Sequence, residues 1–144
     1  MTSGFEVTAD GGSRGNPGAA AYGAVIHRDG LPVRELAASI GVATNNTAEY
    51  RSVLAALDWI AAHTDEPDAR VAVRMDSKLV VEQMSGRWRI KHPDMRNLAA
   101  QVRRAYPPEL VSYEWIPRSR NQHADALVNE ALDTGPGTVI DRAP

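Results

Sequence analysis

Residues 5–18, with the sequence FEVTADGGSRGNPG, decide the fold. Apolar side chains fall at every second position from Phe5 to Ala9, which is typical of a β-strand with one buried face. This pattern ends at Asp10, and the glycine-rich residues 11–18 are expected to form a turn or loop. The sequence therefore predicts an acidic side chain at the end of the first strand, beside a loop with little steric bulk.

The pattern continues outward from this stretch as more strands and then helices. Two strand patterns follow at 20–27 and 31–40, separated by the hairpin signal Arg28-Asp29-Gly30. Later elements are a helix from the N-cap candidates at 44–47 to about 64, strands at 69–75 and 111–116, and helices at about 77–85, 93–105 and 121–133. The order β-β-β-α-β-α-α-β-α predicts an α/β fold, with a five-stranded mixed sheet and helices packed on it.

The length of 144 residues suits one domain. We expect this domain to cover residues 1–134, and residues 135–144, which begin Gly-Pro-Gly, to be a flexible tail or the start of a linker. The chain has no cysteine, which excludes disulfides, thiolate zinc sites and cysteine nucleophiles. No apolar run has the ~18 residues of a membrane span, and residues 1–6 show no signal-peptide pattern. We therefore expect a cytoplasmic protein, monomeric and without a membrane partner.

The net charge is −2, from 18 acidic and 16 basic side chains, which by itself argues against a partner made of nucleic acid. The charged side chains are unevenly distributed along the chain. Residues 1–69 hold 9 acidic and 4 basic side chains, whereas residues 78–104 hold 7 basic and 2 acidic ones. This basic segment is either a solvated face or a surface that meets an anionic partner.

Four acidic side chains stand near the ends of predicted elements, next to core-facing positions. Asp10 and Asp76 follow strand patterns, and Glu49 and Asp125 lie in the first turns of helices. Any one of them has a simpler interpretation as a turn former, a helix cap or a charge that favours the helix dipole. Four carboxylates at one edge of a sheet repel one another unless a cation lies between them, and Mg²⁺ prefers such oxygen ligands. The pattern indicates a site for two divalent ions that flank a phosphodiester.

Four motifs occur in an order that resembles type 1 ribonuclease H: TADGGSRGNPG at 8–18, TNNTAEY at 44–50, MDS at 75–77 and NQHADAL at 121–127. The resemblance covers most of the chain. It implies the ribonuclease H fold and endonucleolytic hydrolysis of the RNA strand of RNA/DNA hybrids, leaving 3′-hydroxyl and 5′-phosphate ends. It also implies that two Mg²⁺ or Mn²⁺ ions are held by the catalytic residues Asp10, Glu49, Asp76 and Asp125, with Asp10 bridging both.

The resemblance further implies contacts with the hybrid duplex. The glycine stretch and the two asparagines at 45–46 are expected to sense the RNA minor groove and its 2′-hydroxyl groups. Asn16 and Thr44 are expected to grip a phosphate of the DNA strand, and Ser77 with Lys78 to touch another. Turn chemistry and helix capping are the alternative explanation for these residues. The expected substrate-binding residues are Gly11, Gly12, Ser13, Asn16, Thr44, Asn45, Asn46, Ser77, Lys78, Trp88, Arg118 and Arg120.

Two segments depart from the pattern of many relatives. Only GRWRIK at 86–91 stands where those relatives carry a long basic protrusion. Its Trp88 either lines the DNA strand together with the neighbouring cations or packs into the core. The segment IPRSRN at 116–121 lacks the histidine that many relatives place in a loop before the last acid. Arg118 or Arg120 is expected to bind a phosphate there instead.

The leading hypothesis is a two-metal ribonuclease H. One alternative is a hybrid-binding module without catalysis, against which the full set of four acids argues. Another is a DNA nuclease on the same fold, and the TNN-x-x-E motif with its glycine stretch favours the RNA-sensing branch over it. Some relatives carry this domain at the amino terminus of a longer chain, so a fused carboxyl-terminal domain is a further expectation.

Overall fold

A computed structural model describes residues 4–144. The absence of a signal-peptide pattern was expected over residues 1–6, and residues 1–3 of that stretch lie outside the described residues. The strands are β1 (Gly4–Arg14), β2 (Gly18–Arg28), β3 (Leu31–Ala43), β4 (Arg70–Met75), β5 (Val111–Trp115) and β6 (Val139–Arg142). The helices are α1 (Asn45–His63), α2 (Lys78–Met84), α3 (Pro93–Ala105) and α4 (Gln122–Thr134), with short 3-10 helices η1 (Pro108–Leu110) and η2 (Arg118–Arg120).

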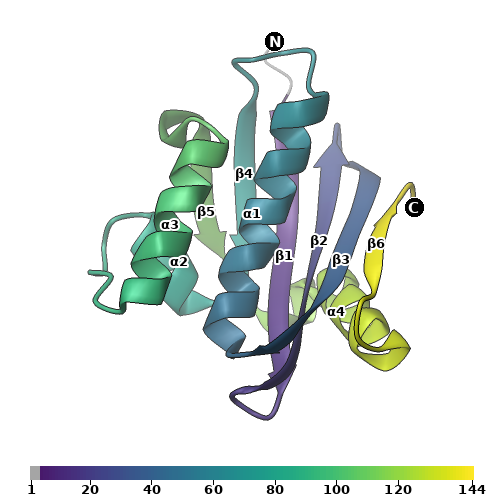
Figure 1. Ribbon diagram of the computed structural model, residues 1–144. Helices are drawn as coiled ribbons and strands as arrows, with labels where there is room; N and C mark the ends of the chain where they lie inside the picture. The colour runs from purple at the N-terminus through teal and green to yellow at the C-terminus, as the bar shows by residue number, and fades with distance from the viewer. Residues whose placement is uncertain (1–3) are drawn as a thin grey trace.

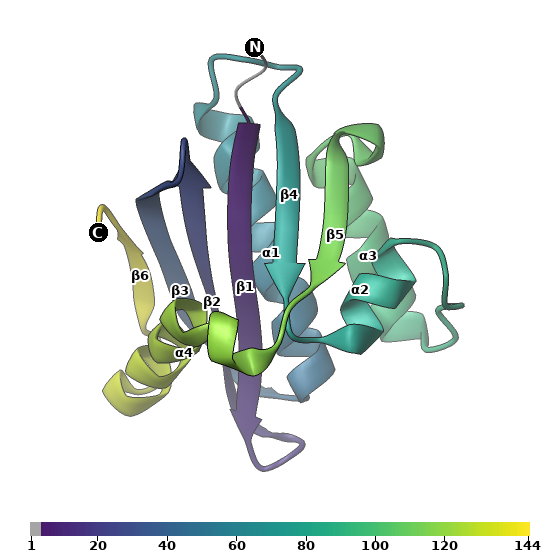
Figure 2. The same cartoon turned by 180° about the vertical axis from the view of Figure 1, so that it is seen from behind.

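The molecule has three layers, with the sheet in the middle. Helices α1, α2 and α3 lie on one face of the sheet (Figure 1), and α4 lies on the other (Figure 2). The strand order is β5-β4-β1-β2-β3-β6. Strands β1 and β2, β2 and β3, and β3 and β6 pair antiparallel, whereas β4 runs parallel to both β1 and β5. Because β1 and β4 are parallel neighbours, Asp10 in β1 and Asp76 just after β4 each follow the paired residues Ala9 and Met75 by one position.

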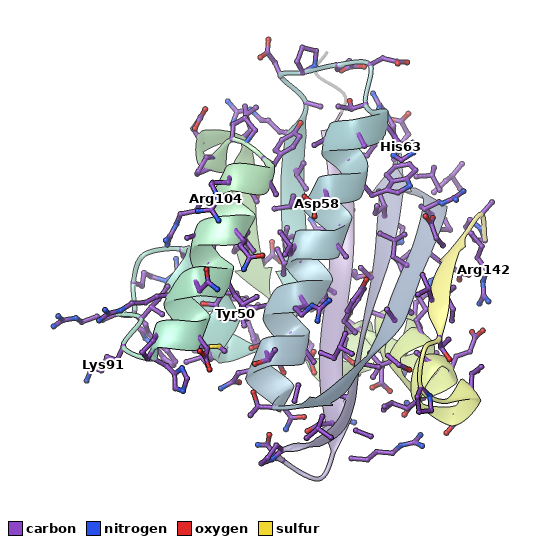
Figure 3. All side chains as sticks on the ribbon, viewed as in Figure 1. Tyr50, Asp58, His63, Lys91, Arg104 and Arg142 are labelled. Carbon is purple, nitrogen blue, oxygen red and sulfur yellow. The ribbon has the colours of Figure 1, made fainter. Side chains whose placement is uncertain are left out.

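A separate hydrophobic core fills each gap between layers. The larger core joins α1, α2 and α3 to the sheet, and the buried side of α1 carries Tyr50, labelled in Figure 3, together with Val53, Leu57 and Ile60. The smaller core joins β2, β3 and β6 to α4 through residues such as Val25 and Leu127. These residues are the apolar stripes that the periodicity predicts, so the predicted α/β fold with a mixed sheet is confirmed.

The glycine-rich stretch differs from the expectation of a loop. Residues 11–14 continue β1 and pair with β2, from Gly11 opposite Tyr22 to Arg14 opposite Ala19. Only residues 15–17 form the turn. Asp10 therefore lies within a strand rather than at its end. The glycines allow close packing, because a Cβ on Gly11 would lie 2.3 Å from the Glu49 backbone nitrogen.

The sheet has six strands rather than the predicted five, and the expected flexible tail contains the sixth. Strand β6 pairs with β3 from Val139 opposite Ala38 to Arg142 opposite Glu35. Its Ile140 is only 9% exposed and belongs to the smaller core. The prediction was wrong here because four residues with a single buried side chain give no periodic pattern.

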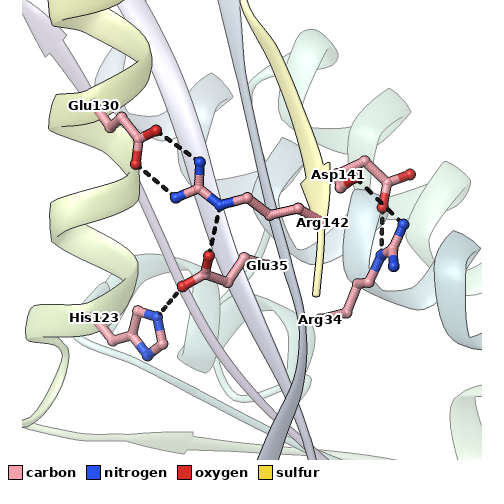
Figure 4. A network of polar contacts seen from close by, with 6 residues as sticks. All are labelled: Arg34, Glu35, His123, Glu130, Asp141 and Arg142. Atoms are coloured by element: carbon pink, nitrogen blue, oxygen red, sulfur yellow. Dashed lines mark hydrogen bonds and ion pairs between the residues drawn. The ribbon is translucent and has the colours of Figure 1, made fainter. Parts of the chain in front are cut away.

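Ion pairs also hold β6 in place (Figure 4). The guanidinium of Arg142 donates to both carboxylate oxygens of Glu130 on α4, at 2.8 Å each, and to Glu35 on β3 at 2.8 Å. The other oxygen of Glu35 contacts Nε2 of His123 at 2.5 Å. This network joins β3, β6 and α4.

In the part of the chain that the structure describes, no helix is long and apolar enough to cross a membrane.

Candidate active site

The four acidic side chains come together from four separate elements. Asp10 belongs to β1, Glu49 to α1 and Asp125 to α4, and Asp76 follows β4 directly. All four line one cavity of about 310 Å³. The cavity lies at the end of β4, beside the middle of β1, where α1 and α4 both approach the sheet.

Helix α1 reaches the cavity because its first turn packs on Gly11 of β1. The helix begins after Thr44, whose hydroxyl accepts a hydrogen bond from the Thr47 backbone N–H at 3.2 Å. There is no room for a side chain between this turn and Gly11. The strand and the helix therefore bring Asp10 and Glu49 to the same place.

Helix α4 reaches the cavity through a second glycine, Gly23, which the sequence analysis did not single out. A Cβ on Gly23 would lie 2.6 Å from the carbonyl oxygen of Ala124 and 2.9 Å from Cβ of Leu127. The helix backbone therefore lies directly on β2, and Asp125 follows Ala124. The available signal was a glycine inside an otherwise apolar strand pattern, which often marks a close approach of another backbone.

Burial and mutual repulsion disturb two of the carboxyl groups. Burial raises the pKa of Asp10 to about 8, and Asp76, a hydrogen bond with Asp125, the charge of Asp125 and the charge of Glu49 raise it as well. Burial also raises the pKa of Glu49 to about 7, against a hydrogen bond from Ser77 that lowers it, and the charge of Asp76 adds a smaller upward contribution. The cavity therefore favours either protons or a cation.

The donor set fits a hard divalent cation. Within residues 4–144, no three acidic or histidine side chains already surround one point closely enough to hold a metal ion. The repulsion that raises the pKa of Asp10 also keeps the carboxylates apart, and a divalent cation between them would remove this repulsion. The residues that line the cavity offer carboxylate, amide and backbone oxygens and include neither histidine nor cysteine. Such ligands suit Mg²⁺ or Mn²⁺ rather than zinc or copper.

Hydrogen bonds join the glycine stretch to the start of α1. The Asn45 side-chain oxygen accepts from the Ser13 backbone N–H at 2.8 Å and from the Ser13 hydroxyl at 3.1 Å. The Asn45 backbone N–H in turn donates to the Asn16 side-chain oxygen at 3.1 Å. As a result Gly11, Gly12, Ser13 and Asn45 line the cavity of the carboxylates.

Other expected contacts line a second cavity, of about 510 Å³, beside the first turn of α1. Asn16, Thr44 and Asn46 line it together with Arg89 and Lys91. The structure thus divides the predicted substrate contacts between an acidic cavity and a neighbouring cavity that carries two cations.

Five further expected contacts have different surroundings. Ser77 is 8% exposed, and its hydroxyl accepts from the Val80 backbone N–H at 3.2 Å. This hydroxyl therefore caps α2, and the phosphate contact expected of Ser77 stays a prediction. Lys78 is exposed and lies 3.5 Å from Glu82. Trp88 is 46% exposed, so the alternative that it packs into the core was wrong. Arg118 lines the carboxylate cavity, and Arg120 is exposed on η2 and lines neither cavity.

Known proteins resemble the chain over most of its length. A family model described as "Reverse transcriptase-like" matches residues 8–131. The "Bifunctional protein Rv2228c" of Mycobacterium tuberculosis is 52% identical over 130 residues, which are 88% of this chain and 35% of that protein. The chain thus spans about a third of the length of this curated relative.

Two solved structures have the same fold. The N-terminal RNase H domain of Rv2228c from Mycobacterium tuberculosis superposes with a TM-score of 0.83 at 46% identity, over 92% of this chain and 96% of that one. The structure of LC11-RNase H1 in complex with an RNA/DNA hybrid superposes with a TM-score of 0.80 at 37% identity, over 90% and 97% of the two chains.

Proposed function

The chain belongs to the ribonuclease H-like family described as reverse transcriptase-like, and we propose that it hydrolyses the RNA strand of RNA/DNA hybrids. The observation that carries the proposal is the meeting of four carboxylates from four elements at one cavity. Cleavage is endonucleolytic, depends on two Mg²⁺ or Mn²⁺ ions, and leaves 3′-hydroxyl and 5′-phosphate ends.

In this proposal the protein supplies positioned oxygen ligands and a binding surface for the substrate. Asp10 is central, because the other three carboxylates all act on its pKa. Asp10 would hold the divalent ions together with Glu49, Asp76 and Asp125. When bound there, divalent ions would supply the positive charge needed to activate a water molecule and to stabilise the leaving oxygen. The high pKa of Asp10 describes the metal-free site, in which protons take the place of cations.

We propose that the two cavities together select the substrate, each by contacting one strand of the hybrid. The backbone at Gly11 and Gly12 and the amide of Asn45 lie at the carboxylate cavity, where they meet the minor groove and the 2′-hydroxyl groups of the RNA strand. The second cavity, with Arg89 and Lys91, takes a phosphate of the DNA strand. Arg118 at the carboxylate cavity is proposed to bind a phosphate near the scissile bond, in place of the histidine of many relatives.

A panel of duplexes tests the reaction. RNA/DNA hybrid, double-stranded DNA and double-stranded RNA are incubated with the protein in Mg²⁺, Mn²⁺ or EDTA, and the product ends are analysed. We expect cleavage of the RNA strand of the hybrid with either metal and none in EDTA. Binding of the hybrid without cleavage in either metal would support a non-catalytic module, and cleavage confined to DNA would support a DNA nuclease.

The Asp10→Asn variant tests the site. It removes one negative charge from the centre of the cluster at nearly constant size, so we expect cleavage to fall by about 10³-fold or more while the far-ultraviolet circular dichroism is retained. The matched control is Asp133→Asn, which makes the same change at an exposed residue on α4, paired with Arg14. Appreciable cleavage by purified Asp10→Asn would contradict the assignment.

The setting of the domain is a separate proposal. The greater length of the mycobacterial relative supports a second domain in the full-length protein. We propose that the ribonuclease H-like domain acts in the cytoplasm as a monomer whose partner is the hybrid duplex. Light scattering of the purified chain measures the oligomeric state, and a dimer would contradict this part of the proposal.

A further inference from the structure

Asn121 is a buried polar residue that the proposed reaction does not use. It stands between η2 and α4, and its side chain is only 1% exposed. Asparagine immediately before a helix usually caps it with the side-chain oxygen. Here the side chain makes no capping hydrogen bond with α4. Its amide nitrogen is instead directed to other partners.

The amide nitrogen of Asn121 has two partners, and both concern the carboxylate cluster. It donates to the carbonyl oxygen of Ala9 at 2.8 Å and to Oδ1 of Asp76 at 2.9 Å. Both partners are acceptors, which settles which end of the amide carries the hydrogens. Ala9 immediately precedes Asp10 in β1. One amide group thus holds the backbone beside Asp10 and one carboxylate oxygen of Asp76.

The backbone of Asn121 reaches a third member of the cluster. Its carbonyl oxygen accepts a hydrogen bond from the Asp125 backbone N–H at 3.1 Å, in the first turn of α4. The same residue therefore joins β1, the end of β4 and the start of α4. These are the elements that supply Asp10, Asp76 and Asp125.

The other side-chain atom of Asn121 indicates that folding alone does not explain the residue. Its Oδ1 is buried and has no hydrogen-bond partner among the residues that the structure describes. An unpaired buried acceptor destabilises a fold. The amide is nevertheless kept in this place, with its nitrogen against the cluster.

We propose that Asn121 is a positioning residue, an inference that rests on the proposed function. Asn121 fixes the Asp76 carboxylate and holds α4 against β1. As a result, Asp10, Asp76 and Asp125 keep the spacing that binds divalent cations. Removing a hydrogen-bond partner of a metal ligand typically weakens metal binding or activity by about 10–100-fold. Asn121 touches neither the substrate nor the cation in this assignment and acts through the three carboxylates.

The test measures metal binding by the protein alone. Isothermal titration calorimetry with Mg²⁺ and Mn²⁺ is performed on the wild type, Asn121→Ala and Asn121→Ser. Serine is well tolerated before a helix, so Asn121→Ser keeps the start of α4 while its short hydroxyl cannot span both acceptors. We expect the metal dissociation constant to rise about 10–100-fold in both variants. At saturating metal, we expect the KM for the hybrid to stay close to that of the wild type.

The matched control loses a buried hydrogen bond far from the cluster. The hydroxyl of Tyr106, which is also buried, donates to the carbonyl oxygen of Ala69 at 2.5 Å, so Tyr106→Phe removes one such bond. In EDTA, both Asn121→Ala and Tyr106→Phe are expected to lower the Tm. Added Mn²⁺ is expected to raise the Tm of Tyr106→Phe as much as that of the wild type, and that of the Asn121 variants by less.

The outcomes separate this inference from the proposed function. Wild-type metal affinity in both Asn121 variants would overturn the inference and leave the function standing. Failure of the wild type to bind either metal would overturn both. If the wild type binds metal without cleaving hybrids, a weaker affinity in the two variants still supports a positioning role for Asn121 at a metal site, and only the proposed reaction fails.

Discussion

At the scale of single residues, Asp10 shows that its neighbours rather than its type determine its chemistry. An aspartate after a strand pattern is commonly a turn former, and the chain has 18 acidic residues in all. Asp10 differs from most of them because the protein buries it beside Asp76, Asp125 and Glu49, which raises its pKa to about 8. The metal-free protein must therefore either hold protons at the cluster or tolerate repulsion there.

This repulsion predicts a pH-dependent stability. The folded pKa values of Asp10 and Glu49, about 8 and about 7, lie above their ordinary values of 3.8 and 4.5. The folded state therefore binds more protons than the unfolded state in that range, and the stabilising contribution is lost as the pH rises from about 4 to about 8. Urea unfolding in EDTA between about pH 5 and about pH 8 should show the free energy of unfolding falling with pH.

The Asp10→Asn variant is the comparison for this measurement. It cannot release the proton that Asp10 releases, so its stability should fall less steeply over the same range. Mg²⁺ added to the wild type at the high-pH end should restore stability, because the cation replaces the protons. Parallel profiles for the wild type and Asp10→Asn would contradict the raised pKa.

At the scale of elements, β6 shows how a short edge strand is stabilised almost wholly by tertiary contacts. Its four residues bury one large apolar side chain, Ile140, against α4. The pairs of Arg142 with Glu35 and Glu130 join residues that are 107 and 12 positions apart in the chain. These contacts form only when α4 and β3 are already in place.

Because only one side chain of β6 is buried, we expect substitutions at two neighbouring positions to change the free energy of unfolding unequally. Ile140→Ala removes a buried side chain and is expected to reduce the free energy of unfolding by about 2 kcal/mol. Val139→Ala is the matched control, since Val139 is 76% exposed, and its effect is expected to stay within about 0.5 kcal/mol. Denaturant unfolding measures both. Equal and small effects would mean that 139–142 is a loose tail, as the sequence pattern suggests.

At the scale of the whole molecule, the small net charge conceals two surfaces of opposite sign. The carboxylate cavity is acidic, and the second cavity beside it carries Arg89 and Lys91. The net charge of −2 counts the four carboxylates proposed to bind two divalent ions, which would bring the loaded domain to about +2. The total charge was therefore a poor guide to the partner, since a hybrid duplex meets a local surface.

The cations at the second cavity predict a salt-dependent contribution to hybrid binding. Arg89→Ala and Lys91→Ala are each expected to weaken binding and to reduce the slope of log affinity against log salt by about 0.9, because each removes one phosphate contact. The matched control is Arg34→Ala, on β3, where Arg34 is paired with Asp141 of β6. Fluorescence anisotropy with the Asp10→Asn protein as background measures binding. Equal slopes for all three variants would exclude the second cavity from the interface.

Much of the fold was predictable because its signals are local. Alternation from Phe5 to Ala9 and the apolar stripe of α1 each follow from a few neighbouring residues. The extension of β1 to Arg14 was not predictable in the same way. Glycines favour turns in isolation, and only the presence of α1 against Gly11 and of β2 alongside makes this stretch a strand.

The sequence by itself determined the chemical groups of the site, their order along the chain, and the elements that carry them. The tertiary structure alone decided that Gly23 lets α4 lie on β2, that Ser77 caps a helix, and that Asn121 spans three elements. The physical reason is the separation along the chain of the residues that interact. Helix and strand periodicity depends on residues a few positions apart, whereas the Asn121 bond to Ala9 joins positions 112 residues apart. Such contacts exist only once the layers have packed, and they leave no local pattern in the chain.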